Sequence, residues 1–252
     1  MIPLPKILTA FFFLNLFINN AIKAQMLPVN ANILRQVYYL KYGNSEGTAF
    51  LIFYNDEEYV ITAKHLFPKP LKCGSSIKLH LEVEKSSENY AGKYYIHKDT
   101  SLDIAVIKLN KKIKVLETFK IDHQAIIGQD VYFLGYPQFN KTKFNTSHPD
   151  LGIIPFVKKG ILSAISYVNK YNLYYLDGQN NPGFSGGPVV IYDIYSKSFK
   201  ILGVVSGYFN EPIRVKGNQG EIYNEFIETN SGIMLCFPID IAREIIEQEI
   251  IK

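Results

Sequence analysis

Short runs of alternating or continuous apolar residues recur along the chain from about residue 35 onward. They are rich in Tyr, Phe, Ile and Val, and Asn, Gly, Asp, Ser or Pro separate them. This composition and spacing are typical of β-strands. The sequence therefore predicts strands at 35–42, 48–54, 58–62, 76–83, 92–98, 102–109, 130–136, 160–168, 173–176, 188–194, 200–208 and 232–237.

Two local signals refine this pattern. Asn55 and Asp56 separate the runs 48–54 and 58–62, so these runs are predicted to form a hairpin. Only residues 239–251 space their apolar positions as a helix does, and Pro238 stands just before them, where the start of a helix tolerates proline.

Short strands without alternating helices predict an all-β chain built as a sandwich or as barrels. Residues 109–129 lack a clear strand and open on the polar cluster LNKKIK, which places a boundary between two halves. The expected organisation is a first β half at 30–115, a second at 125–238 and a terminal helix at 239–252. No internal repeat is evident.

The first 24 residues have the features of a secretory signal. Lys6 precedes a mostly apolar stretch, residues 7–22, and Ala24 offers a cleavage point. Asn residues keep the unbroken apolar run shorter than the roughly 20 residues that a membrane span needs. We expect export to the periplasm or the outside of the cell, without stable membrane association after cleavage. An uncleaved N-terminal anchor is the alternative.

The charge balance narrows the possible partners. Removal of Lys6 and Lys23 with the signal lowers the formal net charge from +4 to +2. Basic residues are scattered among acidic ones, so nothing indicates binding to nucleic acid. Cys73 and Cys236 fit no metal-binding spacing, and they could pair in an oxidising compartment although nothing requires it. We expect no metal and no cofactor.

The stretch DGQNNPGFSGGPVVIYD, residues 177–193, surrounds Ser185 with glycines. Its GFSGG spacing fits both the nucleophile elbow of α/β hydrolases and the serine loop of proteases. A serine nucleophile needs a histidine base that a carboxylate orients. Every histidine of the chain precedes Ser185, whereas an α/β hydrolase places its histidine after the serine. The order of residues excludes the esterase interpretation.

His65 and Asp103 are the candidate partners of Ser185. His65 closes the strand-like run VITAKH, and Asp103 precedes the apolar run IAVIKL, where its side chain can turn toward a cleft. The chain order His, Asp, Ser is the order of chymotrypsin-type proteases. Structural positions are expected for three other histidines, His80, His97 and His123.

These segments together resemble the trypsin-like serine proteases of the chymotrypsin fold. VITAKH after a GTAF strand, LDIAVIKL and GFSGGP are similar to the family's three catalytic segments, and VYFLGYP, KKGILSAI and GIMLCFPIDIA resemble stretches of bacterial HtrA-like proteases. The resemblance spans residues 47–247. It implies two six-stranded antiparallel β-barrels, at 30–115 and 125–238, with the active site between them.

The resemblance also implies roles for the candidate residues. His65 would act as base and then acid, Asp103 would hold its tautomer, and Ser185 would attack a peptide carbonyl. The N–H groups of Gly183 and Ser185 would form the oxyanion hole, because glycine lets the loop turn both donors toward one point. The expected function is a serine endopeptidase that acts on protein or peptide substrates. A non-catalytic peptide-binding or scaffolding protein on the same fold is the alternative.

The sequence departs from the family at two places. Phe184 stands where digestive proteases carry an aspartate, so activation by a newly freed N-terminus is not expected. Gln179 stands at the base of the primary pocket, which argues against cleavage after Lys or Arg. Glutamate-specific relatives use a histidine of the second barrel, and His148 is the only candidate here. His148 is expected in a loop and not in a pocket wall, so apolar or small P1 residues are favoured over glutamate. The rest of the pocket is expected from Ser206, Gly207, Tyr208 and Gly232, and no PDZ domain is expected.

Overall fold

The computed structural model describes residues 29–68, 71–83, 86–113, 119, 121, 125–139, 142–143, 147–148, 152–168, 170–217 and 222–250. The predicted signal at 1–24 and His123 lie outside these residues. No helix among the described residues is both long enough and apolar enough to cross a membrane.

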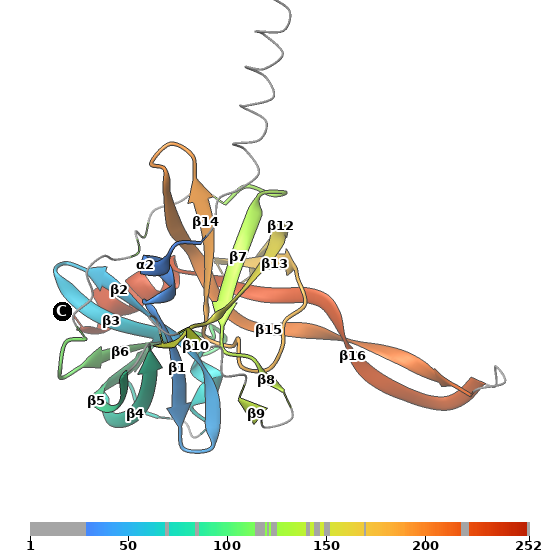
Figure 1. Ribbon diagram of the computed structural model, residues 1–252, viewed down its shortest axis with the longest axis horizontal. Coiled ribbons are helices and arrows are strands. Elements are labelled where there is room, and N and C mark those ends of the chain that lie inside the picture. Colours follow the sequence, from blue (N-terminus) through green and yellow to red (C-terminus); the bar gives the residue numbers. More distant parts are fainter. Residues whose placement is uncertain are drawn as a thin grey trace, which may run out of the picture. The chain divides into compact units, whose positions relative to one another are not determined.

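The first six long strands close into an antiparallel barrel in the order β1-β2-β3-β6-β5-β4 (Figure 1). A short helix, α2 (Ala31–Leu34), precedes it, and a 3₁₀ turn, η1 (Lys64–Leu66), follows β3. The strands are β1 (Val37–Tyr42), β2 (Ser45–Tyr54), β3 (Glu57–Thr62), β4 (Ser75–Val83), β5 (Ser86–Ile96) and β6 (Ala105–Leu109).

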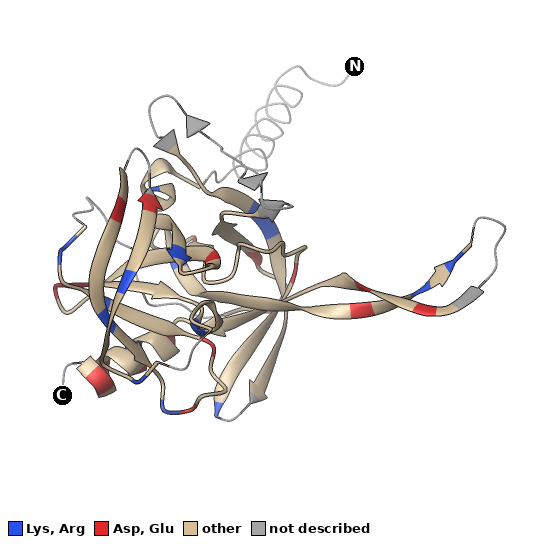
Figure 2. Cartoon of the chain, turned by 90° about the horizontal axis from the view of Figure 1, so that it is seen from below, with Lys and Arg blue, Asp and Glu red and all other residues tan. Residues whose placement is uncertain are grey.

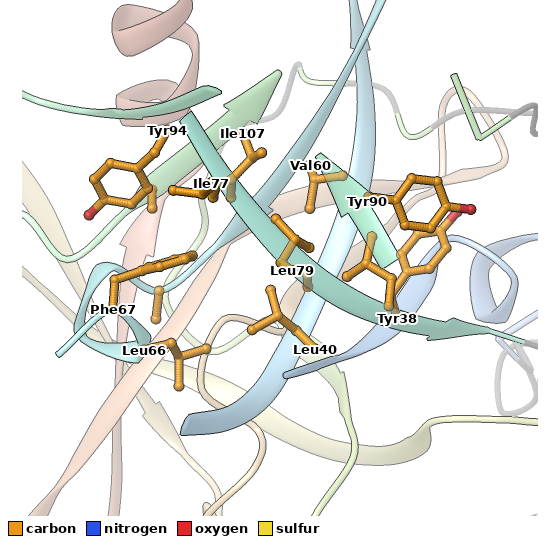
Figure 3. Packing of buried hydrophobic residues seen from close by; sticks show 14 of the residues in the cluster. Tyr38, Leu40, Val60, Leu66, Phe67, Ile77, Leu79, Tyr90, Tyr94 and Ile107 are labelled. Atoms are coloured by element: carbon orange, nitrogen blue, oxygen red, sulfur yellow. The ribbon is translucent and has the colours of Figure 1, made fainter. Parts of the chain in front are cut away.

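Alternating side chains fill the first barrel. Along β5, Tyr90 and Tyr94 are buried while Lys93 between them is exposed, because successive residues of a strand face opposite sides. Leu79 of β4 lies at the centre of the buried cluster in Figure 3, with Val60 and other residues of the cluster around it. The predicted hairpin is confirmed, since Asn55 and Asp56 both adopt the positive φ angles of a type I′ turn, 49° and 60°.

The second barrel is also closed and antiparallel, in the order β12-β13-β16-β15-β14-β7. Its strands are β7 (Asp130–Gly135), β12 (Phe156–Val168), β13 (Tyr171–Asp177), β14 (Pro188–Asp193), β15 (Ser198–Lys216) and β16 (Ile222–Pro238). Two small sheets lie between β7 and β12 in the chain, formed by β8 (Gln138–Phe139) with β9 (Thr142–Lys143) and by β10 (Ser147–His148) with β11 (Gly152–Ile153). The expected all-β fold with two six-stranded barrels is confirmed.

Strands β15 and β16 continue well beyond the barrel as a two-stranded arm (Figures 1 and 2). In the arm, Asn210 to Lys216 pair with Asn230 to Ile222, and the described residues of β15 there are almost all exposed. The predicted strands at 200–208 and 232–237 were too short. Polar residues and Pro212 interrupt the apolar alternation from which the strands were predicted.

The C-terminal helix α3 (Asp240–Ile245) begins directly after β16 and continues into the π-helical turn η2 (Ile246–Ile250). Ile241, Ala242 and Ile245 are buried, which gives the apolar face that the sequence predicted. Both cysteines are free thiols: Cys73 is exposed, and Cys236 is buried in the second barrel, where burial raises the pKa of its thiol. Basic and acidic positions are interspersed over the barrels and along the arm in Figure 2.

Candidate active site

His65 lies in the η1 turn at the end of β3, and its partner Asp103 lies just before β6. Because β3 and β6 are paired neighbours in the first barrel, these two chain segments meet at one edge. The His65 Nδ1 atom is 2.7 Å from Asp103 Oδ2, and the His65 backbone N–H donates to Asp103 Oδ1 over 2.9 Å. One carboxylate thus fixes both the backbone and the imidazole ring of His65.

Ser206 in β15 extends this pair into the second barrel. Its hydroxyl donates to Asp103 Oδ2 over 2.5 Å. Asp103 is largely buried, with 14% of its side chain exposed against 46% for His65. The sequence placed Ser206 in the pocket wall and missed this contact, for which its only signal was a hydroxyl directly after the apolar run ILGVV.

The loop from Gly183 to Gly187 brings Ser185 to the junction of the two barrels. Gly183 and Gly186 adopt positive φ angles of 103° and 83°. At Gly186 an added Cβ would lie 2.2 Å from Thr48 O and 2.2 Å from Thr62 Oγ1, so only glycine fits there. The loop closes on itself through the Gly187 N–H, which donates to Phe184 O over 2.8 Å.

Thr48 of β2 ties this loop to the first barrel. Its N–H donates to Ser185 O over 2.9 Å, and its hydroxyl donates to Gly183 O over 2.7 Å. The same hydroxyl accepts the Tyr136 N–H over 3.0 Å, and Thr48 is fully buried. Thr48 lies within the GTAF run, but nothing in the sequence assigned it a role. A hydroxyl at a buried strand position was the signal for one.

The N–H groups of Gly183 and Ser185 make no hydrogen bond to another described residue. The carbonyl groups of Gly183 and Phe184 are meanwhile held by Thr48 Oγ1 and the Gly187 N–H. Two amide donors of one loop are therefore available to a ligand, as an oxyanion hole requires.

The Ser185 hydroxyl donates to Ser206 O over 3.2 Å. Within the described part of the chain it has no hydrogen bond to His65, so the His–Asp pair is assembled while the Ser–His bond is not made. Hydrogen bonds between a nucleophile and its base are often long or poorly aligned without substrate and tighten in the complex.

Phe184 is fully buried in the core of the second barrel, where its ring meets Phe133 edge-on at 5.5 Å between centroids. Gly135 makes room for that ring, because an added Cβ there would lie 2.6 Å from Phe184 Cδ1. Apolar packing therefore anchors the serine loop at the position where digestive proteases have a carboxylate.

The expected pocket residues fall into two groups. Gln179 is exposed beside Gly178, whose N–H donates to Gly232 O over 2.9 Å, and Gly232 has a φ of 80°. Ser206, Gly207 and Tyr208 lie together on β15. Gly232 thus contacts Gly178, the neighbour of Gln179 in the chain, and Ser206 contacts Ser185.

The described side chains of the other histidines have partners that explain them structurally. His80 Nδ1 lies 3.1 Å from Asn89 Oδ1 across the β4–β5 pair. His97 accepts the Asp99 N–H over 2.9 Å and contacts the Tyr171 hydroxyl at 3.1 Å. Among the described residues no cluster of three His, Cys, Asp or Glu side chains could hold a metal ion.

Two antiparallel barrels with a His–Asp pair from the first and a glycine-bounded serine from the second define a protein of the chymotrypsin-like fold. Residues 47–193 match the model of the trypsin-like peptidase domain, and this chain belongs to that family. The expected class, a trypsin-like serine peptidase, is confirmed.

Individual proteins give the same assignment. The chain is 26% identical over 200 residues to a protein named "Serine protease HtrA-like" from Staphylococcus haemolyticus strain JCSC1435. That match covers 77% of this chain and 26% of the relative, so the chain spans about a quarter of its length.

Two solved structures share the fold. The inactive form of the Rv3671c protease has a TM-score of 0.55 at 16% identity, covering 88% of this chain and 92% of that one. The HtrA-type protease AlgW with a tripeptide has a TM-score of 0.57 at 19% identity, covering 87% and 63%.

Proposed function

We propose that this protein is an exported serine endopeptidase that cleaves peptide bonds through an acyl-enzyme. The observation that carries the proposal is the 2.7 Å contact between His65 Nδ1 and Asp103 Oδ2, in a site that Ser206 links to Ser185. A histidine oriented by a largely buried carboxylate next to a serine is the arrangement that activates a hydroxyl.

Acylation begins when the Ser185 hydroxyl turns from Ser206 O to His65 Nε2. The serine oxygen attacks the substrate carbonyl carbon while its proton passes to His65, and Asp103 stabilises the resulting imidazolium. The Gly183 and Ser185 N–H groups stabilise the negative oxygen of the tetrahedral intermediate. The C–N bond then breaks, His65 protonates the leaving amine, and the acyl group stays on Ser185.

Deacylation repeats these steps with water. His65 removes a proton from the water as it attacks the ester carbon, and it returns that proton to the Ser185 oxygen when the C–O bond breaks. The carboxylic acid product leaves and the free serine is restored. No metal or cofactor takes part in either half.

The substrate is a protein or peptide, in keeping with the family. Gln179 brings no negative charge to its end of the pocket, which disfavours Lys and Arg at P1 and leaves apolar or small residues favoured. Export rests on the signal-like residues 1–24, and we expect the mature protein to begin near Gln25. N-terminal sequencing of the secreted protein tests this start.

A fluorescent alkyl fluorophosphonate tests the enzyme directly, because it phosphonylates only an activated serine. Wild-type protein should be labelled, and Ser185→Ala and His65→Ala should not. His80→Ala is the matched control, since His80 has its own structural partners, and it should be labelled as the wild type is. Folded wild-type protein that stays unlabelled would contradict the proposal and favour a non-catalytic peptide-binding protein.

A further inference from the structure

Two consecutive lysines of β12 have opposite surroundings. Lys159 is exposed, and its ammonium forms an ion pair with Asp130 over 2.8 Å. Lys158 faces the other side of the strand and is half-buried. The two residues are of one type and adjacent on one strand, so Lys159 is a matched control for the effect of removing the Lys158 ammonium.

The Lys158 ammonium is held by neutral oxygens of the segment that leads to Ser185. Nζ donates to Gln179 O over 2.7 Å and to Asn181 Oδ1 over 2.5 Å. Among the described residues no carboxylate lies within ion-pair distance of it. Burial lowers the pKa of this ammonium from its ordinary value, so the charge is kept there at a cost and not for an ion pair.

The same ammonium also contacts the serine loop. Nζ lies 5.3 Å from the centre of the Phe184 ring, a cation–π distance. That ring packs against Phe133 and Gly135 in the core of the second barrel. Lys158 thus joins Gln179 and Asn181, on one side of Gly183, to Phe184 on the other.

The segment between these contacts needs such a tie. Pro182 is exposed, and Gly183, at a φ of 103°, has the backbone freedom to turn its N–H elsewhere. Among the described residues, the segment is closed on itself by one long bond, from the Phe184 N–H to Asn181 O over 3.2 Å, and Thr48 Oγ1 holds the Gly183 carbonyl but not its N–H. Donors of an oxyanion hole help catalysis only when their direction is fixed beforehand.

We propose that Lys158 is a positioning residue: by joining Gln179 and Asn181 to the Phe184 ring, its ammonium keeps the Gly183 N–H aimed at the reacting oxygen. This inference rests on the proposed peptidase function. The Lys158 contacts explain how the Gly183–Gly187 loop is held in a chain where Phe184 replaces the ion-pairing aspartate of digestive proteases.

The test measures saturation labelling of the full chain by the alkyl fluorophosphonate, whose tetrahedral adduct uses the oxyanion hole but carries no P1 side chain. Lys158→Met should lower the maximal labelling rate by about 10- to 100-fold, less than the ~10²- to 10³-fold loss from deleting an oxyanion donor. The half-saturating reagent concentration should change by less than about twofold, because ground-state binding is not affected. Lys158→Arg should restore the rate to within about threefold, since a guanidinium is also cationic.

Lys159→Met is the matched control and should label as the wild type does. Asn181→Ala, which removes one acceptor, should slow labelling by about threefold, and it replaces Lys158→Met if that variant does not fold. Thermal unfolding of each variant separates a loss of alignment from a loss of fold.

Three outcomes would overturn the inference: Lys158→Met labelled at the wild-type rate, a loss confined to the half-saturating concentration, or no rescue by arginine. A loss confined to peptides with acidic P1 residues would instead assign Lys158 to substrate binding. Unlabelled wild-type protein would overturn the proposed function, whereas wild-type labelling with an unaffected Lys158→Met overturns this inference alone.

Discussion

The two barrels have the same strand topology but hold their catalytic candidates by different means. If the strands of each barrel are numbered 1 to 6 in chain order, β7 is strand 1 and β16 is strand 6 of the second barrel. Both closed sheets then follow the order 1-2-3-6-5-4. His65 and Ser185 both lie in the connection that leaves the third strand, β3 in one barrel and β13 in the other. In the first connection His65 lies in the turn η1, which the Asp103 carboxylate holds. In the second connection Ser185 lies in a glycine loop held by backbone contacts and by Thr48.

The two proposed catalytic side chains are therefore held differently. Charge-assisted bonds hold His65, the proposed base, and such bonds are about twice as strong as neutral ones. Ser185, the proposed nucleophile, is held through its backbone, while its hydroxyl bonds to Ser206 O. Breaking that bond costs about 0.5–1.5 kcal/mol, which substrate binding can supply.

The largest expected effect comes from removing the Ser185 hydroxyl or the His65 imidazole, the proposed reactive groups of the two connections. Ser185→Ala should lower the rate of peptide hydrolysis by roughly 10⁶-fold, and His65→Ala by a similar factor, since the residues act as one unit. Neither side chain is in a barrel core, so thermal unfolding should stay nearly unchanged. A variant that keeps substantial activity would disprove the assigned roles.

The next effect tests whether the first connection depends on the carboxylate charge. Asp103→Asn preserves the shape but stabilises the wrong tautomer of His65, and kcat should fall by about 10⁴-fold. The measurement is kcat for a peptide substrate, with Asp99→Asn, a half-buried aspartate of the same loop that does not contact His65, as control. Equal losses in both variants would mean that loop structure, and not the His65 tautomer, causes the effect.

The sequence was sufficient for the fold and for the two equivalent connections because both depend on local patterns. Alternating apolar residues predict strands wherever one face is buried, and the chain order of His65, Asp103 and Ser185 distinguishes between hydrolase classes. The arm parts of β15, up to Lys216, and of β16, from Ile222, escaped prediction because an exposed arm needs no apolar alternation.

The contacts of Thr48, Lys158 and Ser206 could not be predicted from the sequence, for a different reason. Each joins segments far apart in the chain, as Thr48 does with Gly183 and Ser206 does with Asp103. The partners of Thr48 and Ser206 depend on how the two barrels meet, and those of Lys158 depend on how the segment after β13 packs against β12. A single sequence carries no periodic signal for either arrangement. A threonine in a strand or a serine after an apolar run fits many local roles equally well.

Thr48→Val tests the link by which the first barrel holds the second connection. The change keeps the shape of the side chain but leaves Gly183 O and the Tyr136 N–H without their buried partner. Each lost partner costs about 1–3 kcal/mol, so the free energy of unfolding should fall by roughly 2–6 kcal/mol. Thr48→Ser keeps the hydroxyl and should lose much less. Denaturant unfolding of the two variants makes the comparison, and equal losses would refute the hydrogen-bond explanation.

Ser206→Ala should have a smaller effect, because it removes one donor to Asp103 and leaves the backbone carbonyl that Ser185 uses. The two His65 contacts to the carboxylate remain. We expect kcat to fall by about 5- to 10-fold, the equivalent of one hydrogen bond, at an unchanged KM. Ser198→Ala, at the half-buried start of β15 and far along the strand from Ser206, is the control. A loss near that of Asp103→Asn would instead show that Ser206 is required to hold the carboxylate.

The last effect is confined to alkaline pH, with none expected near neutrality, and it separates the second connection from the first. Burial lowers the pKa of Lys158 below 10.5, and its positioning contacts require the protonated form. Activity should therefore be retained below this lowered pKa and decline as the pH rises through it. The groups that the ammonium contacts, Gln179, Asn181 and the Phe184 ring, do not titrate in this range, and Asp130 on the neighbouring strand pairs with Lys159. In Lys158→Arg the guanidinium stays charged, so the alkaline decline of the fluorophosphonate labelling rate should move to higher pH. An alkaline limb at the same pH in both proteins would show that the loop does not depend on the charge of Lys158.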